Sequence, residues 1–453
     1  MTKNTSAYRR LELILDAGSF MELGESVTAR CSDLCAGEKA LSDGVVTGYG
    51  TIDSRPVYVY SQDATVLGGS IGEMHAKKIL RMYKLAMKTF TPVIALIDCS
   101  GLRLTEGADA IHAYSKLYKA QSDARGVIPQ IAAVFGDCGG GMAIAAGMAD
   151  FVLTEEKNGK IFVNAPSARK FDGARNTIDK FLKENPATDE VSAEEASEES
   201  LCSYIRELYG YLPLSCDDFA PQTECDDDLN RLVACETEDP EDVLMQIADL
   251  GTYIEVGAAS KAGALTGFMR LDGNVVGFVA NKEDRLTAAA CNKISDFVDF
   301  CNAFSIPLLT VANVSGFSTE KGEEEALPKA AAYMAGAYAY AEIPRVNLIT
   351  GKAMGAAFSA MCSKGLGSEF VFAWKDAKVQ VMPEDMGAKI LWAEELDKAE
   401  NKAQLLEEKK AEYLAKAGLE AFLARGYVDK AIEPEDTRKV VLGAFEMLLA
   451  QEF

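Results

Sequence analysis

The sequence has very few of the side chains that most enzymes use for proton transfer and metal binding. Its 453 residues include only two histidines, His75 and His112, and both fall on predicted helices, where we expect partly exposed surface positions. Eleven cysteines are scattered along the chain, and the closely spaced Cys31 and Cys35 have no second pair beside them. Because zinc sites need a complete set of such ligands, we predict that the protein binds no metal.

Positive charge is also in short supply. There are 46 lysines and arginines against 69 aspartates and glutamates, which gives a formal net charge of −23. This balance argues against nucleic acid as a partner, although a local basic patch would still bind a small anion. No stretch reaches membrane-spanning length, Met1 to Arg10 carries no apolar signal core, and free cysteines suit a reducing compartment. We therefore predict a cytoplasmic protein and leave a membrane-bound partner open.

Motifs for nucleophilic catalysis are missing as well. No Gly-x-Ser-x-Gly segment is present, and no ordered set of serine, histidine and aspartate can be assembled. Chemistry without a side-chain base has to rely on other groups. Backbone N–H groups that stabilise a developing oxyanion are the simplest candidates.

One glycine-rich segment offers such groups. Gly136 to Ala143 follows an apolar run, Val127 to Phe135, that predicts a buried strand. It precedes a segment of helical character, Met142 to Met148. A strand, a glycine turn and a helix start leave backbone N–H groups unpaired, which favours an oxyanion hole. The same segment fits a tight packing turn equally well, and its glycine spacing matches neither a dinucleotide fingerprint nor a P-loop.

The same signals return in the same order 215 positions later. The matching positions are Pro92 and Pro307, Ser100-Gly101 and Ser315-Gly316, Gly107 and Gly322, Ile128-Pro129 and Ile343-Pro344, Gly136 and Gly351, and Gly140 and Gly355. Chance does not supply so long an ordered set. We predict two homologous α/β units, joined by a linker rich in proline and aspartate at residues 212–228.

Each predicted unit begins with a pair of strands, followed by a long helix and a buried strand that ends in a Ser-Gly loop. A second helix and a second buried strand follow, and that strand ends in the glycine turn. In the first unit we expect helices at residues 8–15 and 73–90, and strands at 42–50, 56–63 and 93–98. Helical segments should run from residue 382 to the end. Because loops after parallel strands lie at one edge of a sheet, the two loops of a unit should converge.

These motifs resemble the carboxyltransferase subunits of biotin-dependent acyl-CoA carboxylases and decarboxylases. The likeness extends over nearly the whole chain, and residues 68–76 are most similar to methylmalonyl-CoA decarboxylase alpha subunits, with propionyl-CoA carboxylase beta chains in the same group. The segments that carry it are 44–50, 61–63 with 68–70, 126–131, 211–215, 300–307 and 425–429.

The resemblance implies two tandem crotonase-like domains. Residues 1–225 would form the acyl-CoA side and residues 226–453 the biotin side. It also implies a homo-oligomer, built from dimers and expected to be a hexamer, with sites between the first unit of one subunit and the second unit of another. The implied partners are an acyl-CoA, a biotin carrier protein, and either a biotin carboxylase or a sodium-pumping membrane decarboxylase subunit.

The resemblance further implies the reaction and its residues. A carboxyl group would move between biotin and the α carbon of a short acyl-CoA, either methylmalonyl- or propionyl-CoA or malonyl- or acetyl-CoA, through enolates held by backbone donors. Residues expected to be catalytic are Gly140, Gly141, Gly355 and Ala356. Those expected at the substrate are Ser100, Gly101, Leu102, Arg103 and Gly139, and those expected at biotin are Gly316 and Phe317.

The second half departs from the family pattern, which keeps two alternatives open. Ser315 stands where the family has proline, the helix that covers residues 326–334 lacks the family's glycines, and Pro383 replaces the glycine of a Val-Met-Gly motif. In the first alternative, the chain is a CoA-ester enzyme that does not use biotin and carries out a hydratase-like or hydrolytic reaction, with Glu106 as its base. Alternatively, it would be a non-catalytic subunit of a carboxylase or decarboxylase complex.

Overall fold

The computed structural model describes residues 5–30, 40, 42–164, 189–190, 197–234, 239–258, 260 and 262–450. The chain divides into two compact units, residues 1–221 with 257–260 and residues 222–256 with 261–453. The change of unit falls within the segment predicted as a linker. Cys31, Cys35 and most of the acidic stretch at 189–199 lie outside the described residues. Which unit serves the acyl-CoA and which serves biotin stays a prediction.

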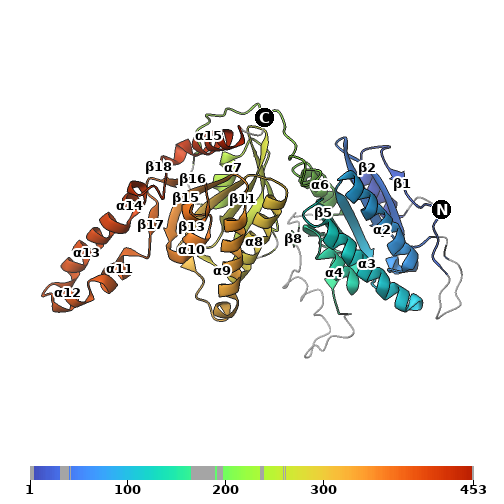
Figure 1. The fold of residues 1–453 in the computed structure, drawn as a ribbon, viewed down its shortest axis with the longest axis horizontal. Helices are drawn as coiled ribbons and strands as arrows, with labels where there is room; N and C mark the ends of the chain where they lie inside the picture. The colour runs from blue at the N-terminus through green and yellow to red at the C-terminus, as the bar shows by residue number, and fades with distance from the viewer. Residues whose placement is uncertain are drawn as a thin grey trace. The chain divides into compact units, whose positions relative to one another are not determined.

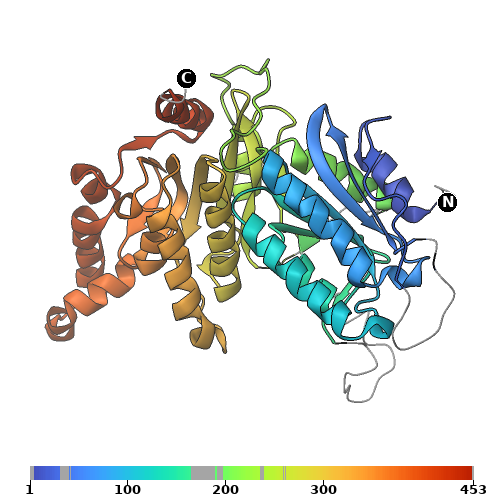
Figure 2. The ribbon, with the colours of Figure 1, turned by 45° about the vertical axis from the view of Figure 1, so that its right-hand side comes forward.

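The first unit is built on one mixed sheet. Its described strands run in the order β1-β2-β3-β4-β5-β6-β8, with β7 added beside the end of β5. Strand bounds are β1 Met21–Glu22, β2 Val45–Ile52, β3 Arg55–Gln62, β4 Val93–Cys99, β5 Gln130–Gly139, β6 Phe151–Thr154, β7 Lys160–Phe162 and β8 Asp189–Glu190. Helix bounds are α1 Ser6–Ile14, η1 Leu67–Gly69, α2 Glu73–Thr89, η2 Leu104–Glu106, α3 Ala108–Ala124, α4 Gly141–Ala146 and α6 Glu198–Tyr209. Helices α2 and α3 lie side by side across one face of this sheet (Figure 2).

The second unit repeats this plan. Its described strands run in the order β9-β10-β11-β13-β15-β16-β18, with β17 beside the end of β15 and a small separate pair, β12 and β14. Strand bounds are β9 Ile254–Val256, β10 Ala264–Leu271, β11 Asn274–Asn281, β12 Arg285–Leu286, β13 Leu308–Val314, β14 Gly316–Phe317, β15 Arg345–Met354, β16 Phe370–Trp374, β17 Lys378–Gln380 and β18 Lys430–Ile432. Helix bounds are α7 Pro240–Ile247, α8 Ala288–Ala303, α9 Glu323–Tyr340, α10 Gly355–Ala360, η4 Lys364–Leu366, α11 Glu384–Leu391, α12 Ala393–Lys398, α13 Lys402–Ala417, α14 Leu419–Ala424, η5 Pro434–Asp436 and α15 Thr437–Leu449. Figure 1 shows α11 to α14 extending outward from this sheet.

The duplication predicted from the sequence is confirmed strand by strand. Val93 of β4 pairs with Gln130 of β5, and Leu308 of β13 pairs with Arg345 of β15, so the parallel register repeats at the same offset of 215. Both pairs of strands also show a register shift near their carboxyl ends. The two units are therefore copies in register as well as in topology, and each ends its central strands in the same kind of loop.

The helix predicted at residues 73–90 shows why these segments fold as they do. Its buried residues recur every three or four positions, as in Ala76, Ile79 and Tyr83, so one face packs on the sheet. The N–H of Glu73 donates to Glu106 Oε2 over 2.6 Å, which satisfies one of the orphan donors of the first turn. Phe90 ends the helix in a left-handed conformation, with φ of 51°.

Two sequence predictions need correction. The glycine turn expected from Gly136 to Gly141 is shorter, because β5 continues through Gly139 and pairs there with β7. Only Gly140 and Gly141 remain for the turn. The helical tail predicted after residue 382 is largely confirmed, but it contains β18, which adds a further parallel strand beside β16.

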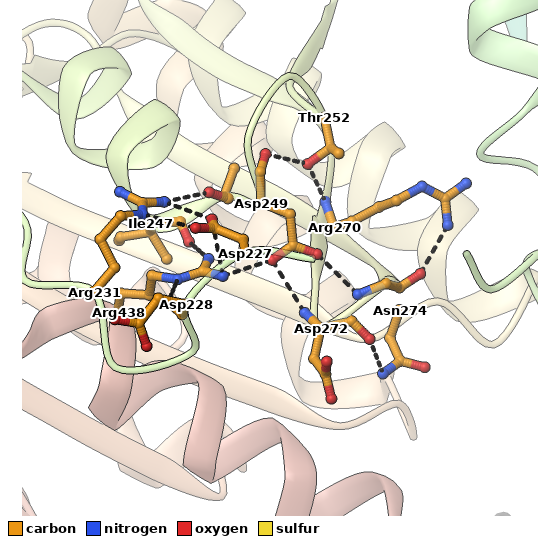
Figure 3. Close-up of polar contacts among 12 residues, drawn as sticks. Asp227, Asp228, Arg231, Ile247, Asp249, Thr252, Arg270, Asp272, Asn274 and Arg438 are labelled. Atoms are coloured by element: carbon orange, nitrogen blue, oxygen red, sulfur yellow. Dashed lines mark hydrogen bonds and ion pairs between the residues drawn. The ribbon is translucent and has the colours of Figure 1, made fainter. Parts of the chain in front are cut away.

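A buried arginine of the last helix, α15, links that helix to the end of α7 and to the turn between β10 and β11 (Figure 3). Arg438 of α15 donates to Ile247 O and, over 2.8 Å, to Asp249 Oδ1. Asp249 in turn accepts the N–H of Gly273 over 2.8 Å in the turn between β10 and β11. One guanidinium thereby ties two helices to a strand turn. Within the described part of the chain, no helix has the length and apolar content needed to cross a membrane.

Candidate active site

The two predicted loops of the first unit meet at the carboxyl ends of β4 and β5. A Cβ placed on Gly139 would lie 3.0 Å from Ser100 O, and one placed on Gly101 would lie 3.3 Å from Gly139 O. The Ser-Gly loop is braced from its other side, because Ile71 N donates to Gly101 O and Arg103 N donates to Ile71 O. Backbone therefore packs against backbone at this point, and the glycines are required for that approach.

The glycine turn that follows β5 is held from both sides. Gly140 adopts φ of 59°, a value that favours glycine, and its N–H donates to Phe162 O over 2.8 Å. Gly141 begins α4, and its carbonyl accepts the hydroxyl of Tyr118 over 2.8 Å. No side chain from the described part of the chain caps this helix, so the first-turn N–H groups, including that of Gly141, have no partner within α4. Of the two predicted donors, Gly141 is the one whose N–H is left for a ligand.

Arg103 was predicted to contact the substrate, but the protein itself uses its guanidinium. Nη1 bonds to Asp43 and Glu106, Nη2 to the carbonyls of Asp43 and Ser70, and Nε to Ser70 Oγ. All five N–H donors of an arginine are thereby occupied. The side chain is 6% exposed, so it holds the Ser-Gly loop against the preceding glycine loop. A direct contact of Arg103 with substrate stays a prediction that this network does not favour.

Glu106, the base of the hydratase-like alternative, is also bonded to other residues of the protein. Its side chain is 2% exposed. Oε1 accepts from Arg103 over 3.0 Å, and Oε2 accepts the N–H of Glu73 over 2.6 Å. A carboxylate whose two oxygens already accept from a charged donor and from a helix N–H has no free edge toward a substrate. This geometry gives that alternative no support.

The two histidines differ from one another. His112 is exposed on α3, as expected. His75 is fully buried, which corrects the prediction of a partly exposed side chain. Its Nδ1 lies 2.9 Å from Asp43 O and its Nε2 lies 3.2 Å from Gln62 Nε2. Burial lowers the pKa of His75 to about 3, with the positive charge of Arg103 adding to the effect, so the ring is neutral.

Two buried thiols lie next to the predicted loops. Cys99 and Cys138 are paired across β4 and β5, immediately before Ser100 and Gly139. Burial raises the pKa of Cys99 to about 11 and raises that of Cys138 further. Both sulfurs are therefore protonated and cannot act as nucleophiles. Among the described residues, no cluster of side chains could hold a metal ion.

The second unit builds the same loops with different side chains. Ser315 N donates to Asp284 O over 2.8 Å, and Ser318 N donates to Leu286 O over 2.8 Å. The corresponding bonds of the first unit run from Ser100 N to Gly68 O and from Arg103 N to Ile71 O. The predicted biotin residues Gly316 and Phe317 form β14, which pairs with β12. The replacement of proline by Ser315 thus leaves the backbone of this loop in place.

The second glycine turn opens onto a pocket. Gly355 has φ of 58°, and a Cβ there would lie 3.0 Å from Val381 O. Gly355 and the exposed Ala356 line a pocket of about 460 Å³, which lies within the usual size range of small-molecule sites. The other lining residues are Phe358, Ser359, Ser363, Lys364, Gly365, Gln380, Val381, Phe422 and Tyr427.

Sequence reasoning predicted only Gly355 and Ala356 among the lining residues and missed the rest, including Gln380, Phe422 and Tyr427. Tyr427 lies in one of the family-like segments, but nothing in that segment marked it as part of a site. Gln380 lies beside the glycine turn only because β17 pairs with the end of β15, where Met354 is opposite Gln380. A three-residue strand carries no periodic signal that would reveal such a partner.

Two α/β copies with this topology, each ending its central strands in a backbone turn, form the tandem crotonase-like architecture of the carboxyltransferases. The chain belongs to the carboxyl transferase domain family, which it matches over residues 3–453. It is 35% identical to the alpha subunit of methylmalonyl-CoA decarboxylase from Veillonella parvula, an alignment covering 98% of this chain and 90% of the relative. It is 36% identical to a putative propionyl-CoA carboxylase beta chain from Bacillus subtilis (strain 168), with the same coverage.

The fold agrees with a solved member of the family. The crystal structure of transcarboxylase 12S, described as a hexamer with methylmalonyl-coenzyme A and methylmalonic acid bound, superposes with a TM-score of 0.92 at 31% identity. The match covers 98% of this chain and 89% of that chain. The predicted crotonase-like fold and family are confirmed.

Proposed function

We propose that this protein moves a carboxyl group between biotin on a carrier protein and the α carbon of a short acyl-CoA. The family and the names of its relatives support the reaction class, with methylmalonyl- or propionyl-CoA as the first candidate esters and malonyl- or acetyl-CoA as the second. The observation that carries the proposal is the pair of matched turns at Gly140 and Gly355, with φ of 59° and 58°. One turn serves each of two substrates that must both be held as anions.

In the first unit, the N–H of Gly141 would bind the thioester oxygen as negative charge develops on it. Gly140 would shape the turn, since its own N–H is bonded to Phe162 O. Ser100, Gly101, Leu102 and Gly139 would line the channel for the acyl-CoA, and Arg103 would hold their loop in place. Losing one oxyanion donor typically raises the barrier by about 3 kcal/mol, so these backbone groups can carry much of the catalysis.

In the second unit, the pocket at Gly355 and Ala356 suits the ring of biotin. Its aromatic wall would cover the flat faces of the uncharged ring, and it contains a buried carboxamide oxygen, Gln380 Oε1, without a partner among the described residues. Gly316 and Phe317 would border the same side of the unit. When bound, biotin supplies or accepts the carboxyl group, and the residues of this chain orient it and exclude water.

The assembly and setting follow from the same proposal. The protein would be a cytoplasmic homo-oligomer, with the hexamer of transcarboxylase 12S as the expected form. A biotin carrier protein would deliver biotin. Either a biotin carboxylase or a sodium-pumping membrane decarboxylase subunit would complete the complex and fix the direction of the reaction.

The test is loss of the carboxyl group from methylmalonyl-CoA or malonyl-CoA, measured by chromatography of the CoA esters with and without free biotin. Biotin-dependent formation of propionyl-CoA or acetyl-CoA is the expected result, and the faster ester names the substrate. If the esters bind but biotin changes nothing, the carboxyltransferase proposal fails for this chain. A non-catalytic role in a complex would then be the better interpretation.

A further inference from the structure

Gln380 occupies an unusual place in the pocket of the second unit. It is the last residue of β17, and its parallel partner in β15 is Met354, the residue immediately before Gly355. This pairing puts Gln380 against the glycine turn, and both residues line the pocket of about 460 Å³. Hydrogen bonding between the two strands fixes the backbone of Gln380 at this position.

The carboxamide oxygen of Gln380 is buried but unsatisfied. The residue is 3% exposed, and within the described part of the chain its Oε1 has no hydrogen-bond partner. Buried polar side-chain atoms nearly always have a partner, because an unpaired one loses its hydrogen bonds to water without replacement. An unpaired acceptor at the wall of a pocket is explained if a ligand that enters the pocket brings the missing donor.

The remaining wall indicates the shape of that ligand. Phe422 and Tyr427 face each other edge to face, with ring centroids 6.1 Å apart, and both line the pocket. Phe358 adds a third aromatic side chain. Lys364 also lines the pocket, but its ammonium group is bonded to both oxygens of Asp429 at 2.9 and 2.7 Å, so its charge is already balanced. The pocket therefore suits a flat, uncharged ring that carries an N–H donor.

We propose that Gln380 recognises the ureido ring of biotin, with Oε1 accepting a hydrogen bond from a ureido N–H. This inference rests on the proposed function and adds a specificity residue to it. One ureido nitrogen exchanges the carboxyl group and the other keeps its hydrogen, so Oε1 has a donor both before and after transfer. A ring without an N–H would leave the acceptor unpaired, and such a site rejects it.

The experiment measures binding directly, by isothermal titration calorimetry of the whole protein with biotin methyl ester and with an analogue methylated at both ureido nitrogens. Gln380→Met keeps the length of the side chain and removes its hydrogen bonding. Gln380→Glu keeps an acceptor oxygen and is the second variant if the first does not fold. Gln404→Met, on an exposed face of α13, is the matched control, and thermal unfolding checks that each variant is folded.

We expect the wild type to bind biotin methyl ester about tenfold more tightly than Gln380→Met does, the size of one lost hydrogen bond. The doubly methylated analogue should bind the wild type and Gln380→Met equally weakly, and Gln404→Met should match the wild type. In the decarboxylation assay, Gln380→Met should raise the KM for biotin and leave the KM for the CoA ester unchanged.

The inference is overturned if Gln380→Met binds biotin methyl ester as the wild type does, or if the wild type does not bind it at all. Its failure can be told apart from failure of the proposed function. Biotin-dependent decarboxylation that is indifferent to Gln380→Met removes only the role of Gln380. Binding that depends on Gln380, in a protein whose decarboxylation ignores biotin, removes only the carboxyltransferase proposal.

Discussion

Arg438 donates to Asp249 from α15 in the second unit, and Arg206 donates to Asp16 from α6 in the first. Each arginine also donates to the carbonyl of the last residue of a helix, Ile247 or Ile14. Both units therefore contain an arginine that bonds to an aspartate and to the end of a helix. Arg438 is fully buried, whereas the side chain of Arg206 is 27% exposed. Because the two arginines differ in burial, we expect their contributions to the free energy of unfolding to differ as well.

Arg438→Met should destabilise the second unit by about 3–5 kcal/mol, because it leaves the carboxylates of Asp227 and Asp249 without their buried partner. Arg206→Met should cost the first unit only about 1 kcal/mol, since water replaces its ion pairs. Urea unfolding followed by tryptophan fluorescence reports on the second unit alone, because Trp374 and Trp392 are the only tryptophans. Far-UV circular dichroism follows both units. Equal losses in the two variants would contradict the role of burial.

Gly141→Ala should impair turnover, because the new methyl group would lie 2.7 Å from the hydroxyl of Tyr118 and move the turn. We expect kcat to fall about 100-fold, the usual cost of displacing one oxyanion donor. Gly141→Ala combined with Tyr118→Phe removes the clashing oxygen and should recover part of the loss. Steady-state kinetics of Gly141→Ala, Tyr118→Phe and the double variant test this, and a double variant no better than Gly141→Ala would show that crowding by Tyr118 is not the cause.

Protein stability should rise with pH between about pH 3 and pH 6.5 through His75. In that range the unfolded chain binds a proton at this histidine and the folded chain does not, because burial lowers the folded pKa to about 3. One such proton changes the free energy of unfolding by about 1.4 kcal/mol per pH unit. His75→Gln removes the titrating group, so the difference in free energy of unfolding between wild type and variant should change with this slope between about pH 3 and pH 6.5. Urea unfolding at a series of pH values measures it, and a constant difference would show that His75 is not buried in a neutral form.

Glu106→Gln separates a structural glutamate from a catalytic base. The variant loses the ion pair with Arg103 and weakens the bond to Glu73 N, so we expect a loss of about 1–3 kcal/mol in stability. Decarboxylation per folded molecule should fall only modestly. If Glu106 were a general base, its removal would lower the rate by about 100- to 10,000-fold, the usual contribution of such a group. A loss of that size in a folded variant would show that Glu106 acts as a catalytic base and contradict its purely structural role.

The sequence alone was enough for the plan of the molecule. The offset of 215 between Pro92 and Pro307 or Gly140 and Gly355 marked two copies, and the structure repeats both the strand order and the register. Apolar runs and helix periodicity placed β4 and α2 to within a residue or so, because burial of one face depends on local spacing. Glycines with positive φ, such as Gly107 and Gly322 before α3 and α9, were visible as repeated letters.

Only the tertiary structure decided which side chains are available. His75 and Glu106 are polar residues on predicted helices or loops, but packing buries them and gives them protein partners. Gln380 has no local pattern that marks it, and the pairing of β17 with β15 puts it beside Gly355. Contacts between segments far apart in the chain depend on strand register and on which side chains are buried away from water. A sequence specifies these through the whole fold, so they cannot be predicted from a local stretch.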